Sequence, residues 1–351
     1  MSTLESQKQA LYPRLYSIES DISMATTAIN EARNNVSRVE AGIAALSSRL
    51  PKVRELGYAA MAHMEKDVDY LNKRWTEISP GVKQTLASGL EPLNSQVNGL
   101  QQEARGLRSQ IDSGNIALGQ ATISRLSPVT SSLRARVASE ADKVNTPLRD
   151  LFTCINSTEG DLKIAEMTLD LFSEANFPMK EDESPVLAVE GKILTGEKNE
   201  GTLFFSNQRF VFEAKKEIVL EKKLFIVTKK KIERVVAINQ PIGALKEIAK
   251  GRVGFIAWTG LYVRFKPDSR QEDAQFDVEG WEADAVTKYF DYIIDGEAEK
   301  DIAAIKGTSA TAKPTVKLVT CSVCHAPYKR EVFKGQKSVQ CEYCGAQIVL
   351  E

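Results

Sequence analysis

Residues 11–50 read LYPRLYSIESDISMATTAINEARNNVSRVEAGIAALSSRL, and their apolar side chains recur at alternating intervals of four and three residues. This spacing is the heptad pattern, which lines apolar side chains along one stripe of a helix. The stripe contains Leu11, Leu15, Ile18, Ile22, Ala25, Ile29, Ala32, Val36, Val39, Ile43, Leu46 and Leu50. A helix with such a stripe buries it against other helices, so this stretch predicts a helical bundle.

Two further heptad runs follow. One contains Leu86, Leu90, Leu93, Val97, Leu100, Ala104, Leu107 and Ile111, and the other contains Val137, Ala141, Val144, Leu148, Leu151, Ile155, Leu162, Ala165, Leu169 and Phe172. Leu50-Pro51 and the turn-forming residues 112–115 separate the three segments. We therefore predict that residues 1–178 form an antiparallel three-helix coiled-coil rod, interrupted near Pro80, Pro92, Pro128 and Pro147. An oligomer formed through the coiled coil is the alternative.

The pattern changes after Pro178, where short runs rich in Val, Ile, Phe and Tyr alternate with turn residues. These runs predict strands at residues 187–194, 201–206, 209–213, 223–227, 232–239, 253–258, 261–266 and 275–278. A short helix is expected at 244–250, and an amphipathic helix begins near Trp281. Residues 185–295 are thus predicted to form a small β-barrel with a C-terminal helix at its open end.

The stretch at residues 190–212, EGKILTGEKNEGTLFFSNQRFVF, resembles the opening of GRAM and prokaryotic pleckstrin-homology-like (PH-like) domains. In that family, residues equivalent to 201–212 form two antiparallel strands. Residues 232–235 and 281–294 resemble the family's later strand and C-terminal helix. The resemblance implies a PH/GRAM-like domain over residues 185–295 that binds a protein or a membrane surface.

Residues 296–317 are rich in Gly, Ala, Thr and Lys and predict a flexible linker. Residues 318–351 then contain four cysteines in a C-x2-C-x16-C-x2-C pattern, which is typical of a zinc ribbon. The predicted ligands of one structural Zn²⁺ are Cys321, Cys324, Cys341 and Cys344, because four thiolates close the coordination shell. Gly345 and His325 follow the two pairs, at a position that commonly needs a positive φ. A redox dithiol and His325 as a substitute ligand are the alternatives.

Seven lysines occur between residues 215 and 231, against two glutamates. They are Lys215, Lys216, Lys222, Lys223, Lys229, Lys230 and Lys231. They could present positive charge to an anionic membrane, or they could line a solvated strand edge and prevent edge-to-edge pairing.

The 46 basic and 47 acidic side chains balance, so global charge does not point to nucleic acid. The polar N-terminus lacks the features of a signal peptide, and a cytoplasmic protein is expected, peripheral on a membrane if the lysines bind one. The sequence carries no phosphate-binding loop and no nucleophile motif. These observations favour a multidomain α+β protein that acts as a non-enzymatic adaptor with a protein partner. A nucleic-acid-associated zinc-ribbon protein is the alternative.

Overall fold

The computed structural model describes residues 3–223, 226–254, 258–307 and 319–350, with side chains for all of these except residues 3, 217–231 and 258. The chain divides into two compact units. The first contains Met1–Ser48 and Lys66–Glu159, and the second contains Arg49–Glu65 and Gly160–Glu351. Residues 49–65 therefore group with the C-terminal part of the chain.

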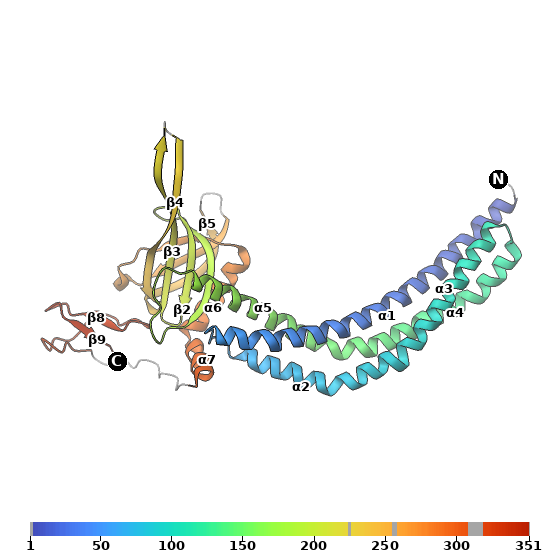
Figure 1. Cartoon of the computed structure of the whole chain (residues 1–351), viewed down its shortest axis with the longest axis horizontal. Coiled ribbons are helices and arrows are strands. Elements are labelled where there is room, and N and C mark those ends of the chain that lie inside the picture. Colours follow the sequence, from blue (N-terminus) through green and yellow to red (C-terminus); the bar gives the residue numbers. More distant parts are fainter. Residues whose placement is uncertain (1–2, 224–225, 255–257, 308–318, 351) are drawn as a thin grey trace. The chain divides into compact units, whose positions relative to one another are not determined.

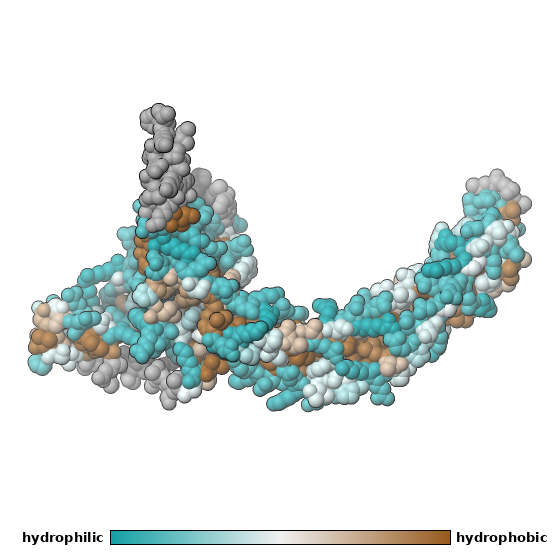
Figure 2. Space-filling view, in the orientation of Figure 1, coloured by the Kyte–Doolittle hydropathy of each residue, from teal (hydrophilic) through white to brown (hydrophobic). Residues whose placement is uncertain are grey.

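The first unit is helical (Figure 1). Its elements are α1 (Thr3–Glu55), α2 (His63–Gln84), the π-helix η1 (Thr85–Leu90), α3 (Glu91–Asp112), α4 (Ile116–Asn145), the 3-10 helix η2 (Thr146–Leu148) and α5 (Arg149–Ser173); α1, α2 and α5 continue into the second unit. All twelve heptad residues between Leu11 and Leu50 are buried. In Figure 2, hydrophilic residues cover most of the visible helical surface.

Cross-helix contacts give the directions of α3 and α4 relative to α1. They join Lys8 to Asp112, Glu19 to Arg108 and Arg33 to Glu91 between α1 and α3, and Asp21 to Arg134 and Asn35 to Asn145 between α1 and α4. Residue numbers rise along α1 as they fall along α3, so these helices are antiparallel, whereas α1 and α4 run the same way. The three-helix arrangement expected from the heptad runs is present, while a coiled-coil supertwist stays a prediction.

The predicted break at Leu50-Pro51 is wrong, because α1 continues to Glu55. Val53 is buried and extends the apolar stripe beyond Leu50, so packing continues past the proline. Pro51 has no N–H and so removes one intrahelical hydrogen bond, but the helix continues through it. Of the four prolines expected to interrupt helices, Pro92 and Pro147 lie at the starts of α3 and η2, whereas α2 and α4 continue through Pro80 and Pro128.

The second unit contains a seven-stranded antiparallel sheet. Its strands are β1 (Pro185–Ile193), β2 (Glu200–Ser206), β3 (Arg209–Lys223), β4 (Ile226–Pro241), β5 (Leu245–Val253), β6 (Trp258–Phe265) and β7 (Ala274–Asp277), with 3-10 turns η3 (Ile242–Ala244) and η4 (Pro267–Ser269). The order is β4-β3-β2-β1-β7-β6-β5, so β4 and β5 are the two edges and the sheet is open. The predicted barrel is corrected to an open sheet, and the helix predicted at 244–250 is strand β5, paired with β6.

Strand β2 is buried on both faces, which explains its continuous apolar run, Leu203-Phe204-Phe205. On one face, Phe204 packs with Ala188 and Val211 against Leu171, Phe172, Ala175 and Phe177, which lie at and just beyond the end of α5. Helix α6 (Gly280–Ile294) packs against β1, β5 and β6, and its buried side chains include Val286, Tyr289 and Ile293. Glu279 and Glu282 form a capping box that starts α6.

The first part of the predicted linker is not a linker. Residues Glu297–Lys306 form α7, between the left-handed Gly296 and Gly307. Ala298, Ile302 and Ala303 are buried, so apolar packing gives this short segment the stability that its composition alone does not suggest. The remainder of the predicted linker, residues 308–317, lies outside the described residues.

The segment between α1 and α2 is held by hydrogen bonds within the second unit. The hydroxyl of Tyr292 accepts from Met61 N at 2.8 Å and donates to Asp301 Oδ2 at 2.7 Å. Tyr58 is fully buried and donates to the carbonyl oxygen of Val186 at 3.0 Å. These contacts attach the chain reversal after α1 to β1, α6 and α7.

Residues 319–350 form a small module, called the cysteine module here. It is built around the hairpin of β8 (Ser338–Gln340) and β9 (Gln347–Val349). Cys321, Val339, Cys341 and Ile348 form its buried core cluster. Among the helices that the structure describes, none combines the length and apolar character needed to cross a membrane.

Candidate metal centre

Two similar turns, called knuckles here, carry the four cysteines: CSVCHA at residues 321–326 and CEYCGA at 341–346. Their hydrogen bonds correspond: Cys321 N donates to Ala326 O and His325 N to Cys321 O, whereas Cys341 N donates to Ala346 O and Gly345 N to Cys341 O. His325 and Gly345 have φ of +59° and +75°. The positive φ predicted after each cysteine pair is confirmed, and it turns the chain back so that both cysteines of a knuckle face one point.

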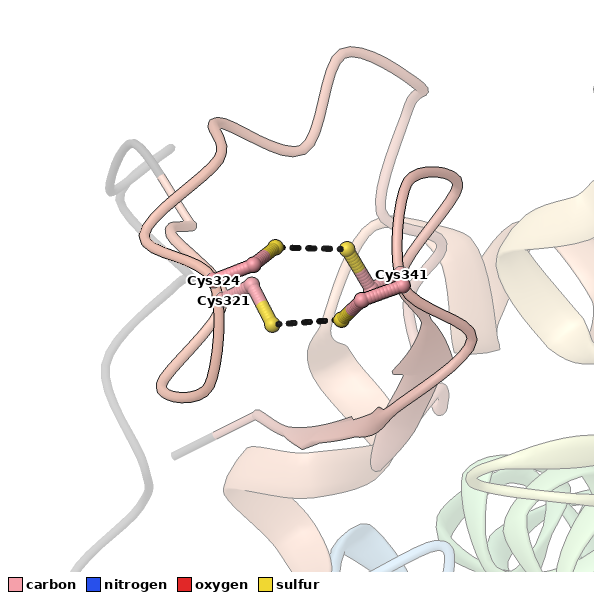
Figure 3. Close-up of side chains that lie close together, drawn as sticks. Cys321, Cys324 and Cys341 are labelled. Atoms are coloured by element: carbon pink, nitrogen blue, oxygen red, sulfur yellow. Dashed lines mark hydrogen bonds between the residues drawn. The ribbon is translucent and has the colours of Figure 1, made fainter.

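The two knuckles bring their sulfur atoms together (Figure 3). Cys321 Sγ lies 3.6 Å from Cys344 Sγ, and Cys324 Sγ lies 3.5 Å from Cys341 Sγ. All four sulfur atoms lie within 4.8 Å of one another. A disulfide requires about 2.05 Å, so these pairs are thiols or thiolates and not cystines.

The spacing fits a metal ion of the size of zinc. Four sulfurs placed about 2.3 Å from a tetrahedral zinc are about 3.8 Å apart, close to the two shortest sulfur separations. A set of four thiolates selects zinc or iron over hard cations such as Mg²⁺. Four cysteines lying this close can therefore hold one metal ion, and they would leave no open position for a substrate or a reactive water.

Hydrogen bonds divide the cysteines into two kinds. The backbone N–H groups of Cys324 and Val323 point at Cys321 Sγ and lower the pKa of that thiol to about 6. The N–H groups of Cys344 and Tyr343 lower the pKa of Cys341 in the same way. These two ligand groups ionise readily, which suits them to a cation, because metals bind the thiolate form.

Cys324 and Cys344, the second cysteine of each knuckle, have raised pKa values instead. The N–H of Ala326 lowers the pKa of Cys324. Hydrogen bonds with the other three cysteines, together with desolvation, raise it by more, so the net pKa of Cys324 is raised. The N–H of Ala346 and a hydrogen bond with Cys324 lower the pKa of Cys344, but desolvation and the hydrogen bonds with Cys321 and Cys341 outweigh them, so the net pKa of Cys344 is raised. Cys321 and Cys341 are buried, whereas Cys324 and Cys344 are exposed, so one side of the site faces solvent.

Two other candidates from the sequence, His325 and Cys154, are not part of the cysteine cluster. His325 is not in the group of side chains that could share an ion among the described residues. Cys154 lies in α5, and burial raises the pKa of its thiol. The sequence thus located the cluster itself, from the spacing of the two pairs.

Two of the seven lysines have described side chains, and both have acidic partners. Lys215 Nζ lies 2.8 Å from Glu190 Oε1, and Lys216 Nζ lies 2.6 Å from Glu197 Oε2. The backbone of the other five lies on β3 and β4, near the far end of that hairpin. The side chains of Lys222, Lys223, Lys229, Lys230 and Lys231 lie outside the described residues.

Sequence reasoning missed a buried polar cluster beside the sheet. Arg209 pairs with Glu183, and both side chains are buried. Arg209 was recognisable only as part of the β2–β3 pattern, and its partner lies 26 residues earlier in an unremarkable acidic stretch. No local signal connects the two residues.

No protein-family model matches the chain, and no curated protein matches it. Solved structures match weakly. The "Vps36 N-terminal PH domain" is 15% identical, with 34% of this chain and 86% of that chain covered and a TM-score of 0.22. "Autoinhibited Vav1" is 12% identical, with 97% and 64% covered and a TM-score of 0.27. The complex of PDZ-RhoGEF DH/PH domains with activated RhoA is 10% identical, with 84% and 96% covered and a TM-score of 0.23. Likenesses this weak assign neither a fold nor a function.

Proposed function

We propose that this protein is a non-enzymatic adaptor that binds a protein partner through a zinc ribbon, with a PH/GRAM-like domain as its second binding module. The observation that carries the proposal is a pair of exposed apolar side chains, Val323 and Tyr343, called the knuckle tips here. They occupy the same position in the two knuckles and are 67% and 61% exposed. Exposed valine and tyrosine on a rigid metal-bound turn are suited to contact another protein.

Zinc has a structural role in this proposal. The cysteine module is too small to build a sufficient core of its own, and a metal supplies the missing folding energy in modules of this size. Its buried core consists of only four residues, two of which are cysteines. Closed coordination by Cys321, Cys324, Cys341 and Cys344 argues against catalysis at the metal.

The PH/GRAM-like identity of residues 185–295 rests on sequence resemblance together with strand order. The stretch that carries the resemblance forms β2 and the first part of β3, an antiparallel pair with Leu203 opposite Phe212. Seven antiparallel strands are followed by one helix, α6. The strand pair and the terminal helix support the proposal, although the sheet is open and not the closed barrel that was expected.

A protein partner is favoured over nucleic acid by the charges of the cysteine module. Three of its basic side chains already have acidic partners: Arg330 with Glu342, Lys334 with Glu299 and Lys337 with Asp182. Paired cations add little to phosphate binding, which depends on releasing counterions from many contacts. An anionic membrane, contacted by the lysines of the β3–β4 hairpin, is the second candidate.

Oligomerisation through the helices is less well supported than a partner at the knuckles. The apolar stripe of α1 is buried within a single chain, against its own helices. The same stripe cannot also pair with a second chain unless the bundle opens. We therefore propose that the helical region acts as a monomeric spacer.

The test compares two serine variants in quantitative affinity purification from cells. Val323→Ser/Tyr343→Ser removes both knuckle tips, and Val349→Ser removes a 75% exposed valine on β9 as a matched control. We expect both to retain zinc and only the first to lose a stoichiometric protein partner. If the knuckle-tip variant recovers the same partner as the wild type, the proposed binding surface is wrong.

A further inference from the structure

The segment between the two knuckles is hydrogen-bonded to another part of the second unit. Residues 331–337, called the docking loop here, belong to the same unit as the seven-stranded sheet with α6 and α7, called the β domain here. Gly243 N, in η3, donates to the carbonyl oxygen of Lys334 at 3.0 Å. A main-chain hydrogen bond therefore joins the cysteine module directly to the connection between β4 and β5.

Two glycines permit this contact between backbones. A Cβ on Gly243 would lie 2.3 Å from Lys334 N, and a Cβ on Gly335 would lie 1.9 Å from the carbonyl oxygen of Gln208. Gly335 also has φ of +82°, which other residues rarely adopt. Each surface thus carries a glycine at its point of closest approach, and a methyl group at either position would separate them.

Side chains strengthen the same contact. Lys334 Nζ donates to the carbonyl oxygen of Ile293 near the end of α6 and lies 3.0 Å from Glu299 Oε1 in α7. A cation at a helix C-terminus is favourable because unpaired carbonyls carry partial negative charge there. Phe333 is buried, with the amine of Lys266 5.5 Å from its ring centre. Two exposed ion pairs lie at the edge, Lys266 with Glu331 and Lys337 with Asp182.

The loop is held in shape by the cysteine core. Leu350 N donates to Lys337 O at 2.8 Å, and β8 begins at the next residue, Ser338. Val339 of β8 packs with Cys321 and Cys341. If the cysteines separate, the hairpin loses its core, and the docking loop loses the support that holds it against η3 and α6.

We propose that the docking loop joins the cysteine module and the β domain into one cooperative unit, so that metal binding at the four cysteines also stabilises η3 and the end of α6. The inference rests on the metal site proposed above. On this proposal, the cysteine module is not an independent zinc ribbon joined to the rest of the chain only by a flexible linker. Loss of the metal would then be transmitted to a surface that contains none of its ligands.

Hydrogen exchange of the full-length protein tests this, with zinc counted in the same samples. The reporter is the peptide 240–246, which contains the Gly243 amide, and the peptide 203–205 in β2 is the internal reference. On removal of zinc with a chelator, we expect exchange in 240–246 to become about tenfold faster or more, and exchange in 203–205 to stay unchanged.

A substitution on the β-domain side provides the second arm. Gly243→Ala introduces the clash with Lys334 without altering the cysteine module, and its φ is not in the left-handed range. Gly280→Ala, where a Cβ meets nothing within 4 Å, is the matched control. We expect Gly243→Ala to keep its zinc yet exchange rapidly in 240–246 with or without chelator, whereas Gly280→Ala behaves as the wild type.

The outcomes separate the two proposals. If wild-type protein binds zinc, loses it to the chelator and keeps slow exchange in 240–246, the cooperative unit is wrong and the metal site stands. If wild-type protein binds no zinc, the metal site itself is wrong, and the linkage falls with it. If Gly243→Ala responds to chelation as the wild type does, the docking loop does not transmit the effect.

Discussion

Arg209 and Glu183 form a buried, two-pronged ion pair. Arg209 Nε lies 2.8 Å from Glu183 Oε1, and Nη2 lies 2.7 Å from Oε2. The side chains are only 8% and 1% exposed. Ser206 donates its hydroxyl to the same carboxylate at 2.6 Å. The ion pair joins the segment that precedes β1, which contains Glu183, to the start of β3, where Arg209 lies.

Removing one member of this pair should be costly. We expect Arg209→Met to lower the free energy of unfolding by about 3–5 kcal/mol, because it leaves the Glu183 carboxylate buried without its counter-charge. The matched control is Arg264→Met, which breaks an exposed pair with Glu247 and should cost about 1 kcal/mol or less. Urea unfolding followed by fluorescence measures both. Equal losses in the two variants would contradict the assigned role of Arg209.

The same pair should make stability depend on pH. Burial raises the pKa of Glu183, but the hydrogen bonds from Arg209 and Ser206 outweigh it and lower the pKa below its ordinary 4.5. The ionised Glu183 therefore stabilises the folded state fully above pH 4.5. This stabilisation is lost as the pH falls through the lower folded-state pKa, because the unfolded chain binds the proton more readily than the folded chain does. In Glu183→Gln this acid-dependent part should be missing. Unfolding free energies of the two proteins measured from pH 6 downward should therefore converge. Curves that stay parallel would show that other carboxylates cause the acid dependence.

Elemental analysis should find one zinc per chain in the purified protein. We expect Cys341→Ser/Cys344→Ser to lose it, because two of the four ligands are gone. Cys154→Ser is the control and should retain the full zinc content, since Cys154 is not in the cluster. Undiminished zinc in the double variant would place the metal elsewhere, and stoichiometric iron would correct its identity.

The apolar stripe of α1 predicts a strong effect at its centre. Ile29 is fully buried, so Ile29→Asp should destabilise the helical unit by about 3–5 kcal/mol, because it places an unpaired carboxylate in an apolar seam. Met24→Asp, at a 52% exposed position on the same helix, should change stability by about 0.5 kcal/mol or less. Thermal unfolding followed by circular dichroism at 222 nm compares the two. A stable Ile29→Asp protein would mean that the stripe does not face the core.

Any membrane binding should be electrostatic and should depend on the lysine run. We expect flotation with anionic vesicles to weaken between 0.1 M and 1 M salt, as the screening length falls from about 10 Å to about 3 Å. Lys229→Glu/Lys230→Glu/Lys231→Glu should abolish it, and neutral vesicles should not bind either protein. The triple variant floating as well as the wild type would leave the lysines only the role of protecting a strand edge.

Features set by short-range pattern could be read directly from the residues. The heptad spacing around Ile29 predicted which side chains are buried, because the period of a helix places them on one face. The two CxxC pairs predicted the cysteine cluster, because each knuckle is built by hydrogen bonds within six residues. The strands at residues 201–206 and 209–213 were readable from their own apolar and aromatic runs, and the family resemblance implied the antiparallel pairing that β2 and β3 form.

Features that depend on distant partners could not be read in this way. Residues 297–306 look like a linker and become α7 because Ala298, Ile302 and Ala303 find an apolar surface elsewhere in the chain. Residues 244–250 have a helical appearance and become β5 because β6 supplies the backbone partners. Arg209 finds Glu183, and Gly243 finds Lys334, across separations at which sequence carries no periodic signal. Periodicity reports which face of an element is apolar, whereas the identity of what covers that face is decided only when the whole chain has packed.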